Sequence, residues 1–280
     1  TLGFDLSLAS AESALRGPKT IKAIHVLSFV MDTWKMIRLW RQRPGATAWP
    51  LTVSATSALG FLSALYFAGV LTLEQTLELV WLHGSAVAES HQEVPSALLM
   101  IVGLPRTELE KQCREAAQAA QGLCQVGFEA GEGSFLCSGT SAAIRALQHS
   151  AALYLKDDLS AGIAKVHLQH GPAEHTPLMG HVRDQLAKKF QALAPSMKPP
   201  RCEVQLGTSK LTPGTSPEVI VHHFLNQLTR RLDFHQVLKQ MVLAGTSEFI
   251  TFRCPGSFPC VCEHILSKER RLEQVTISEL

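Results

Sequence analysis

Residues 56–71 lie between a predicted strand and a predicted helix, which is the context of a nucleophile elbow. Such a turn raises one side chain above the sheet and points the next backbone N–H at an oxyanion, an arrangement suited to acyl transfer. Ser57 carries a hydroxyl at this turn. The Gly-x-Ser-x-Gly spacing around such a serine would place Ala55 and the bulky Leu59 where the turn requires glycine. The residues therefore predict an elbow at which Ser57 does not act as the nucleophile.

Two groups of histidines and cysteines carry the side-chain types that bind zinc. The spacing of the first group, four histidines, matches no ligand pattern. The second group, three cysteines and a histidine, has the spacing Cys-x5-Cys-x-Cys-x-His, which is not the spacing of a zinc finger. We therefore expect no metal site and interpret most thiols as small buried apolar groups. The two groups are His167, His170, His175 and His181, and Cys254, Cys260, Cys262 and His264.

The elbow resembles that of the malonyl-CoA:acyl carrier protein transacylase family, which reads Gly-His-Ser-Leu-Gly-Glu and continues with Ala-Leu and Ala-Gly-Val. Residues 56–61 are Thr-Ser-Ala-Leu-Gly-Phe, and Ala64-Leu65 and Ala68-Gly69-Val70 follow without a gap. Further segments resemble the family in the same order along the chain. They are Leu2–Leu6, Leu98–Leu104, Ser138-Gly139, His175–Met179 and Cys254–Gly256.

The resemblance implies that Ala58 occupies the position of the attacking serine, and His175 that of the histidine which serves as its base. The N–H of Leu59 falls on the oxyanion donor that follows the nucleophile. Phe61 replaces the elbow glutamate, and His83 replaces the arginine whose guanidinium clamps the malonyl carboxylate. The family's Asn-Ser-Pro-x-Gln element falls on residues 129–133, where both amides are absent. Together these changes indicate a catalytically degenerate member.

The elements that position this site follow from the spacing of apolar residues. Between residues 95 and 170 the order strand-helix-strand-strand-helix-strand is that of a ferredoxin-like unit. With the resemblance, this predicts an α/β fold with a three-layer acyltransferase-like core of residues 1–94 and 171–280, and an inserted ferredoxin-like α+β subdomain at 95–170. Helices are expected at 20–41, 59–68, from 72 onward, and at 106–121, 140–155, 217–232 and 234–243; strands are expected at 50–54, 97–102, 123–128, 134–137, 163–168 and 247–252.

The surfaces of the first and third helices carry further expectations. The first helix has an apolar stripe spaced by three or four residues, and the third helix is expected to turn Trp81 inward. Trp34, Trp49 and Trp81 are all expected in the core or at its edge. The cations of the first helix recur every third residue and form either a solvated face or a surface for a protein partner. The stripe consists of Ile21, Ile24, Leu27, Val30, Trp34 and Ile37, and the cationic face of Lys35, Arg38 and Arg41 with Trp40 beside it.

Composition limits the function classes. A chain that is 46% hydrophobic and 18% charged is too apolar to be disordered, and a net charge of +2 does not indicate nucleic-acid binding. No apolar run reaches the roughly 18 residues of a membrane span, so we expect no direct insertion into a membrane. Seven cysteines without the spacing of a disulfide framework favour a reducing compartment.

We therefore expect a catalytically inactive acyltransferase-like protein that serves as a structural or interaction subunit and needs no cofactor. By analogy with the family, the subunit is expected in a large mitochondrial assembly, in the matrix, with plastid and cytoplasm as alternatives. Two other functions stay open: a module that binds acyl carrier protein or acyl-CoA without turnover, and an active transacylase. The vacated site is expected to be filled by Phe61, with His175 hydrogen-bonded to the backbone or to a neighbour.

Overall fold

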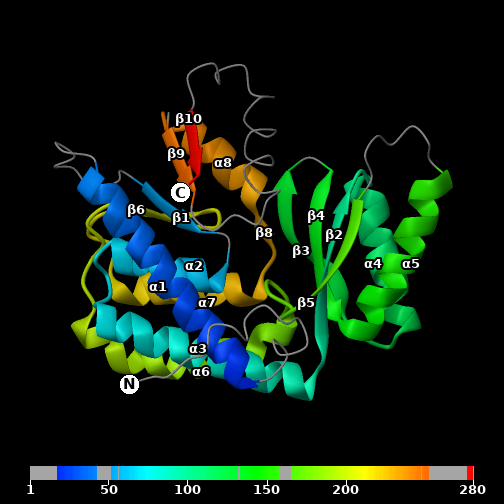
Figure 1. The fold of residues 1–280 in the computed structure, drawn as a ribbon, viewed down its shortest axis with the longest axis horizontal. Helices are drawn as coiled ribbons and strands as arrows, with labels where there is room; N and C mark the ends of the chain where they lie inside the picture. Colours follow the sequence, from blue (N-terminus) through cyan, green and yellow to red (C-terminus); the bar gives the residue numbers. More distant parts are fainter. Residues whose placement is uncertain are drawn as a thin grey trace.

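The computed structural model describes residues 18–42, 52–55, 57–131, 133–157, 165–246, 248–251 and 276–279. Its helices and strands form two parts that lie side by side in Figure 1, and the green part, from β2 to β5, comes from the middle of the chain. The first part begins with α1 (Pro18–Gln42), β1 (Thr52–Ala55), α2 (Ala58–Phe67) and α3 (Leu73–Glu93). Together with the two mixed sheets below, these helices confirm the predicted α/β class.

A three-stranded sheet supports the elbow, in the order β1-β6-β7. β1 runs parallel to β6 (Glu203–Leu206), with Val53 opposite Val204, and β7 (Ser209–Leu211) pairs antiparallel with β6. The sequence did not predict β6 and β7, because they are short and lie among proline- and glycine-rich turns. The predicted strand at 247–252 corresponds to β9 (Glu248–Thr251), which pairs in parallel with β10 (Thr276–Glu279).

Helix α2 lies at the centre of the main hydrophobic core. Seven of its ten residues are buried, because its sequence is apolar on every side. It packs against β1, α3 and α7 (Pro217–Thr229), and α6 (Gly180–Leu193) covers α3 and α7. Figure 1 shows these helices stacked below β1, with α8 (Phe234–Leu243) on the opposite side. The short 3-10 turns Pro177–Met179 and Ala194–Ser196 flank α6.

The turn between α2 and α3 is capped at both of its ends. Gly69, just after the end of α2, has a φ of +74°, a conformation that glycine adopts without strain. Thr72 caps α3: its hydroxyl accepts a hydrogen bond from the N–H of Gln75, while the Gln75 side chain accepts one from the N–H of Thr72. This reciprocal pair is a capping box, in which a threonine N-cap is followed three residues later by glutamine.

The expectation that Trp34 of α1 lies in the core or at its edge is wrong. Val30, Trp34 and Ile37 are exposed, and the helix instead buries the face that contains Phe29 and Thr33. Because α1 carries apolar residues on several faces, spacing alone did not identify the face that packs against α3. Trp81 is also exposed, at 49%, rather than turned inward.

Each of the two exposed indoles has a cation over its ring. The guanidinium of Arg38 lies 5.5 Å from the ring centroid of Trp34, and Nζ of Lys22 lies 5.7 Å from that of Trp81. Such cation–π contacts stabilise indoles that remain at the surface. The side chains of Trp40 and Arg41, and all of Trp49, lie outside the described residues.

The second part has the ferredoxin-like element order. Its strands are β2 (Ser96–Val102), β3 (Cys124–Gly131), β4 (Ser134–Thr140) and β5 (Lys165–His170), and its helices are α4 (Arg106–Ala119) and α5 (Ser141–Asp157). The sheet order β5-β2-β4-β3 places the first and third strands at the centre, each antiparallel to its neighbours. Gly139 permits the close approach of β4 to the Leu123 carbonyl, with which a Cβ would collide.

This second part has a separate core between its sheet and the helices α4 and α5. Three thiols lie in that core, and Sγ of Cys113 is 3.8 Å from Sγ of Cys137. Cys124 is also buried there, and Cys202 is buried in the main core. The interpretation of these four cysteines as small buried side chains is confirmed.

The two parts are joined by more than the chain crossings near residues 95 and 170. β8 (Leu232–Asp233), which follows α7, adds a parallel edge strand to β3. The rings of Phe128 and Phe234 stack beside it with centroids 5.8 Å apart. The sheet of the middle segment is therefore completed by residues from the C-terminal part of the chain, and the subdomain boundaries at 95 and 170 stay a prediction.

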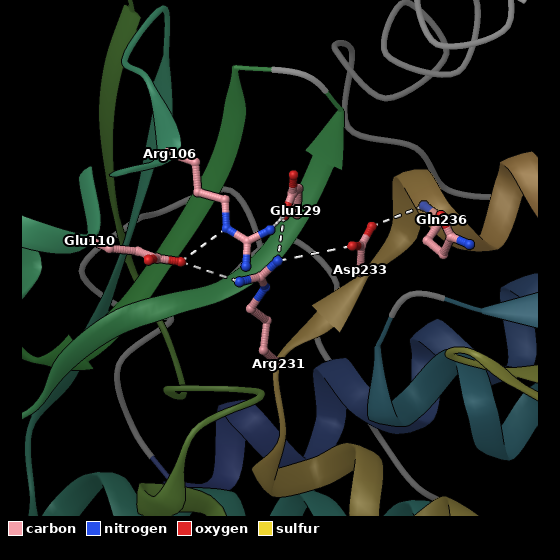
Figure 2. A network of polar contacts seen from close by, with 6 residues as sticks. All are labelled: Arg106, Glu110, Glu129, Arg231, Asp233 and Gln236. Carbon is pink, nitrogen blue, oxygen red and sulfur yellow. Dashed lines mark hydrogen bonds and ion pairs between the residues drawn. The ribbon is translucent and has the colours of Figure 1, made fainter. Parts of the chain in front are cut away.

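A polar network crosses the same junction (Figure 2). Nη2 of Arg231 donates to Glu129 of β3 at 2.6 Å, and Nη1 donates to Glu110 of α4 at 3.4 Å. Arg106 also pairs with both carboxylates, at 3.5 Å and 2.9 Å. Arg231 thus lies between the acidic groups of the middle segment and Asp233, whose carboxylate caps α8 at Gln236.

We expect Arg231→Ala to lower the free energy of unfolding by about 1–2 kcal/mol, because Glu129 is largely buried and would lose its shortest ion pair. Urea denaturation measures this change. Arg183→Ala is the matched control, since the Arg183–Asp184 pair is exposed and should contribute less than about 0.5 kcal/mol. Equal effects of the two substitutions would contradict a special role for the junction.

None of the helices in the described ranges combines the length and the apolar character that crossing a membrane requires.

Candidate functional site

The elbow is the turn from β1 into α2. Ser57 is the N-cap residue of α2, and its Oγ accepts a hydrogen bond from the N–H of Gly60 at 3.1 Å. Ala58 is the first residue of the helix and is 2% exposed. The hydroxyl nearest to the nucleophile position therefore has a structural role, which satisfies one of the N–H groups that a helix start leaves unpaired.

The first turn of α2 has the geometry of an oxyanion site. Backbone N–H groups at the start of a helix have no intrahelical acceptors, and here they include those of Ala58 and Leu59. The N–H of Phe61 is already bonded to the carbonyl of Ser57 at 2.9 Å. Leu59 thus lies at a helix start, next to the methyl side chain of Ala58, and its role as an oxyanion donor stays a prediction.

Phe61 is fully buried, as predicted. Its ring makes an edge contact with Phe224 of α7, with centroids 6.4 Å apart and an interplanar angle of 78°. The surrounding residues belong to the main hydrophobic core. That this ring occupies a former substrate cleft stays a prediction.

His175 lies in a loop before α6 and has a φ of +61°, which is uncommon for a residue other than glycine. Three hydrogen bonds hold it there. Its Nδ1 lies 2.8 Å from the Gln227 carbonyl, its N–H donates to the Leu228 carbonyl at 3.1 Å, and its carbonyl accepts from Nε2 of Gln125 at 3.2 Å. The predicted hydrogen bond between His175 and the backbone is confirmed.

The elbow and His175 meet the same helix, α7. Phe61 contacts Phe224, and His175 contacts Gln227, three residues further along and hence on a similar face of α7. The sequence did not indicate that the elbow and His175 contact the same helix. α7 begins 42 residues after His175, and no residue of that segment was predicted to belong to the site. α7 is therefore the element that positions both halves of the site.

His83 lies in the interior of α3 and is fully buried. Neither ring nitrogen has a hydrogen-bond partner among the described residues, and the ring of His25 from α1 lies 4.9 Å away. Burial, together with the nearby charge of His25, lowers the pKa of His83 from 6.5 to about 3. The position that the resemblance assigns to an arginine thus holds a neutral ring at pH 7.

A carboxyl group lies near these histidines. Burial raises the pKa of the Glu174 carboxyl above its usual value, and the charges of His175 and His25 oppose that shift. His25 itself bonds the Ile21 carbonyl through Nδ1 at 2.7 Å. Sequence reasoning missed His25 and Glu174. In the sequence, only the position of Glu174 directly before His175 pointed to the site. No pattern within α1 pointed to His25.

Other predicted positions have different surroundings. Glu129, which falls on the family's amide element, pairs with Arg231, while Glu132 lies outside the described residues. Within the described ranges, no three or more histidine, cysteine, aspartate or glutamate side chains are arranged to hold a metal ion. His181 lies 3.4 Å from Glu89. The side chains of His167 and His170 are not described, nor are Cys254, Cys260, Cys262 and His264, nor the segments 2–6 and 254–256.

Two curated proteins and one solved structure illustrate what the chain is similar to. The mitochondrial malonyl-CoA-acyl carrier protein transacylase of Homo sapiens is 26% identical over 55% of this chain and 40% of that protein. The malonyl CoA-acyl carrier protein transacylase of Escherichia coli K12 is 32% identical over 30% of this chain and 26% of that protein. The crystal structure of an acyl-carrier-protein S-malonyltransferase from Bartonella henselae superposes with a TM-score of 0.74 at 18% identity, covering 93% of this chain and 77% of that one.

Comparisons in sequence and in structure thus point to one family, the malonyl-CoA:acyl carrier protein transacylases, and the predicted resemblance and fold are confirmed. No family model matches the chain. The chain matches less than half of the length of each of these curated relatives.

Proposed function

We propose that this chain is a catalytically inactive relative of the transacylases that acts as an interaction or structural subunit. The observation that carries the proposal is the start of α2, where the hydroxyl of Ser57 is bonded to the helix N-terminus and the next residue is Ala58, which the resemblance aligns with the nucleophile. Acyl-enzyme formation requires an oxygen or sulfur nucleophile activated by a base. An alanine side chain supplies none.

The neutral state of His83 supports the same proposal. A malonyl group carries a carboxylate, and proteins bind carboxylates most strongly with the paired donors of a guanidinium. His83 has no charge at pH 7 and is enclosed among α1 and α3 residues, with the Cα of Lys22 and the ring of His25 close to the adjoining Gly84. Both the attacking group and the carboxylate clamp are therefore absent at the positions where the family has them.

The exposed apolar side chains of α1 support an interaction role. Val30, Met31 and Trp34 are each about half exposed on one helix, and isolated monomers rarely present several such side chains together. We place the subunit in the mitochondrial matrix, in a larger assembly, by analogy with the human relative, which is a mitochondrial protein. Acyl carrier protein is the alternative partner, since both curated relatives are named for it.

Incubation with malonyl-CoA, followed by intact-mass measurement, tests the catalytic part of the proposal. We expect no malonyl adduct on the wild-type chain and no transfer to acyl carrier protein, because Ala58 cannot be acylated. The variant Ala58→Ser is the informative comparison: with His83 neutral, it should remain orders of magnitude below a transacylase.

A malonyl adduct on any residue of the elbow in the wild-type chain would overturn the proposal. Affinity purification of the tagged chain from mitochondria tests the interaction part. Recovery of a defined set of proteins in one large complex supports the subunit role. Recovery of acyl carrier protein alone would favour the binding-module alternative.

A further inference from the structure

A cavity of about 510 Å³ opens at the end of α2 that is farthest from the elbow. Ten helical residues separate the two ends, which is about 15 Å at the usual rise per residue. The described lining contains none of Ala58, His83 or His175. The cavity is thus distinct from the site that the family resemblance identifies, and its volume is in the range of roughly 300–1,000 Å³ that is typical of small-molecule sites.

Its walls are mainly apolar. They come from the C-terminal half of α1, from the last residues of α2 and from the turn that joins α2 to α3. An apolar chain placed there would leave water, and each methylene that becomes buried should tighten binding by up to about fourfold. The apolar wall residues are Met36, Ile37, Tyr66, Phe67, Val70 and Leu71.

The cationic side of the cavity comes from the segment before β6, which carries Lys198 and Arg201. Two backbone hydrogen bonds fix this segment against the α2–α3 turn: the N–H of Lys198 donates to the Val70 carbonyl at 3.1 Å, and the N–H of Arg201 donates to the Ala68 carbonyl at 2.8 Å. The backbone that carries both cations is therefore fixed at the cavity rather than on a loop that is independent of it.

Gly69 allows Arg201 to approach. Nε of Arg201 lies 2.6 Å from the point where a Cβ of residue 69 would be, so any other residue there would displace the guanidinium. The guanidinium consequently lies directly against the turn that forms the cavity wall. An apolar chamber with fixed cations on one side has the complementary chemistry of an amphiphile with an anionic head.

We propose that this cavity binds a single-chain amphiphile with an anionic head group, its chain among the apolar walls and its head at Lys198 and Arg201. This site would be independent of the catalytic state of the elbow. A folded partner segment is the competing occupant, but a helix has a diameter of about 10 Å, and a cavity of about 510 Å³ with cations at one side fits a slender chain better.

Isothermal titration of the whole chain with laurate, octanoate and dodecyltrimethylammonium tests the proposal. We expect one laurate per chain, weaker binding of octanoate because its chain is shorter, and no binding of the cation. Native mass spectrometry gives the stoichiometry. Absence of laurate binding, or equal binding of the cationic amphiphile, would overturn the proposal.

Two variants with matched controls locate the site. Ile37→Trp should block the cavity and abolish laurate binding, while Ile24→Trp, on the same helix but outside the lining, should not change it. Lys198→Glu should weaken laurate binding about tenfold, because attraction becomes repulsion at a solvated site, whereas Lys188→Glu of α6 should leave it unchanged. Laurate binding that survives Ile37→Trp would contradict the assignment to this cavity.

Discussion

Acid should destabilise the wild-type chain far more than the variant His83→Leu. His83 is fully buried, and its pKa falls from 6.5 to about 3 on folding, so between these values only the unfolded chain binds a proton at this residue. Its contribution to stability is complete above pH 6.5 and is lost as the pH falls toward 3. The loss amounts to about 2 kcal/mol at pH 5 and about 3 kcal/mol at pH 4.

Urea denaturation of both proteins between pH 7.5 and pH 4 measures this effect. At pH 7.5 we expect His83→Leu to be at least as stable as the wild type, because leucine fills a similar volume and removes two ring nitrogens that lack described partners. The exposed His181 provides the control, and His181→Gln should follow the wild-type pH profile. Parallel profiles for the wild type and His83→Leu would show that His83 is accessible to protons, and hence that its surroundings are open.

Replacement of Phe61 by alanine should lower the free energy of unfolding by about 3–5 kcal/mol. Its ring is fully buried and contacts Phe224 in the centre of the main core, where neighbouring helices cannot readily close the space left behind. Thermal and urea denaturation measure the change. Leu153→Ala, at a residue of α5 that is half exposed, should change the stability by less than about 0.5 kcal/mol.

The variant Phe61→Glu separates a filled site from an open one. Glutamate is the residue that the family carries at this position, and in a solvated cleft it would be accepted. In a packed interior it would bury an unpaired carboxylate and cost more than the alanine substitution. A glutamate variant as stable as the wild type would contradict the prediction that Phe61 fills the vacated site.

Local patterns in the sequence predicted most elements, because each depends on neighbouring residues. The capping box at Thr72 and the turn at Gly69 follow from side chains three or four positions apart. The same holds for the strand-helix order of the middle segment, whose turns are rich in glycine. At these positions, the conformation that the neighbouring residues prefer is also the conformation in the final fold.

The predictions that failed concern contacts between residues that are distant in the sequence. The face of α1 that is buried depends on where Gly84 lets α3 approach, and α1 alone offers more than one apolar face. Similarly, β8 is two residues long and exists only because β3 has a free edge to pair with. The residues of the site were identified through the resemblance, but His25 and Glu174 were not, since only the packing of α1 places them beside His83 and His175.

The late pairing of β8 has a consequence for the order of folding during synthesis. The four strands of the middle segment can pair once residue 170 has left the ribosome, but β3 remains at the edge of that sheet. Its partner emerges roughly 60 residues later, which is several seconds at ordinary translation rates. During that interval an unpaired edge is available to other chains, the usual route to intermolecular strand pairing. Docking of Leu232 and Asp233 then pairs Phe128 and Glu129 of β3, and thereby shortens the edge that the nascent chain exposes.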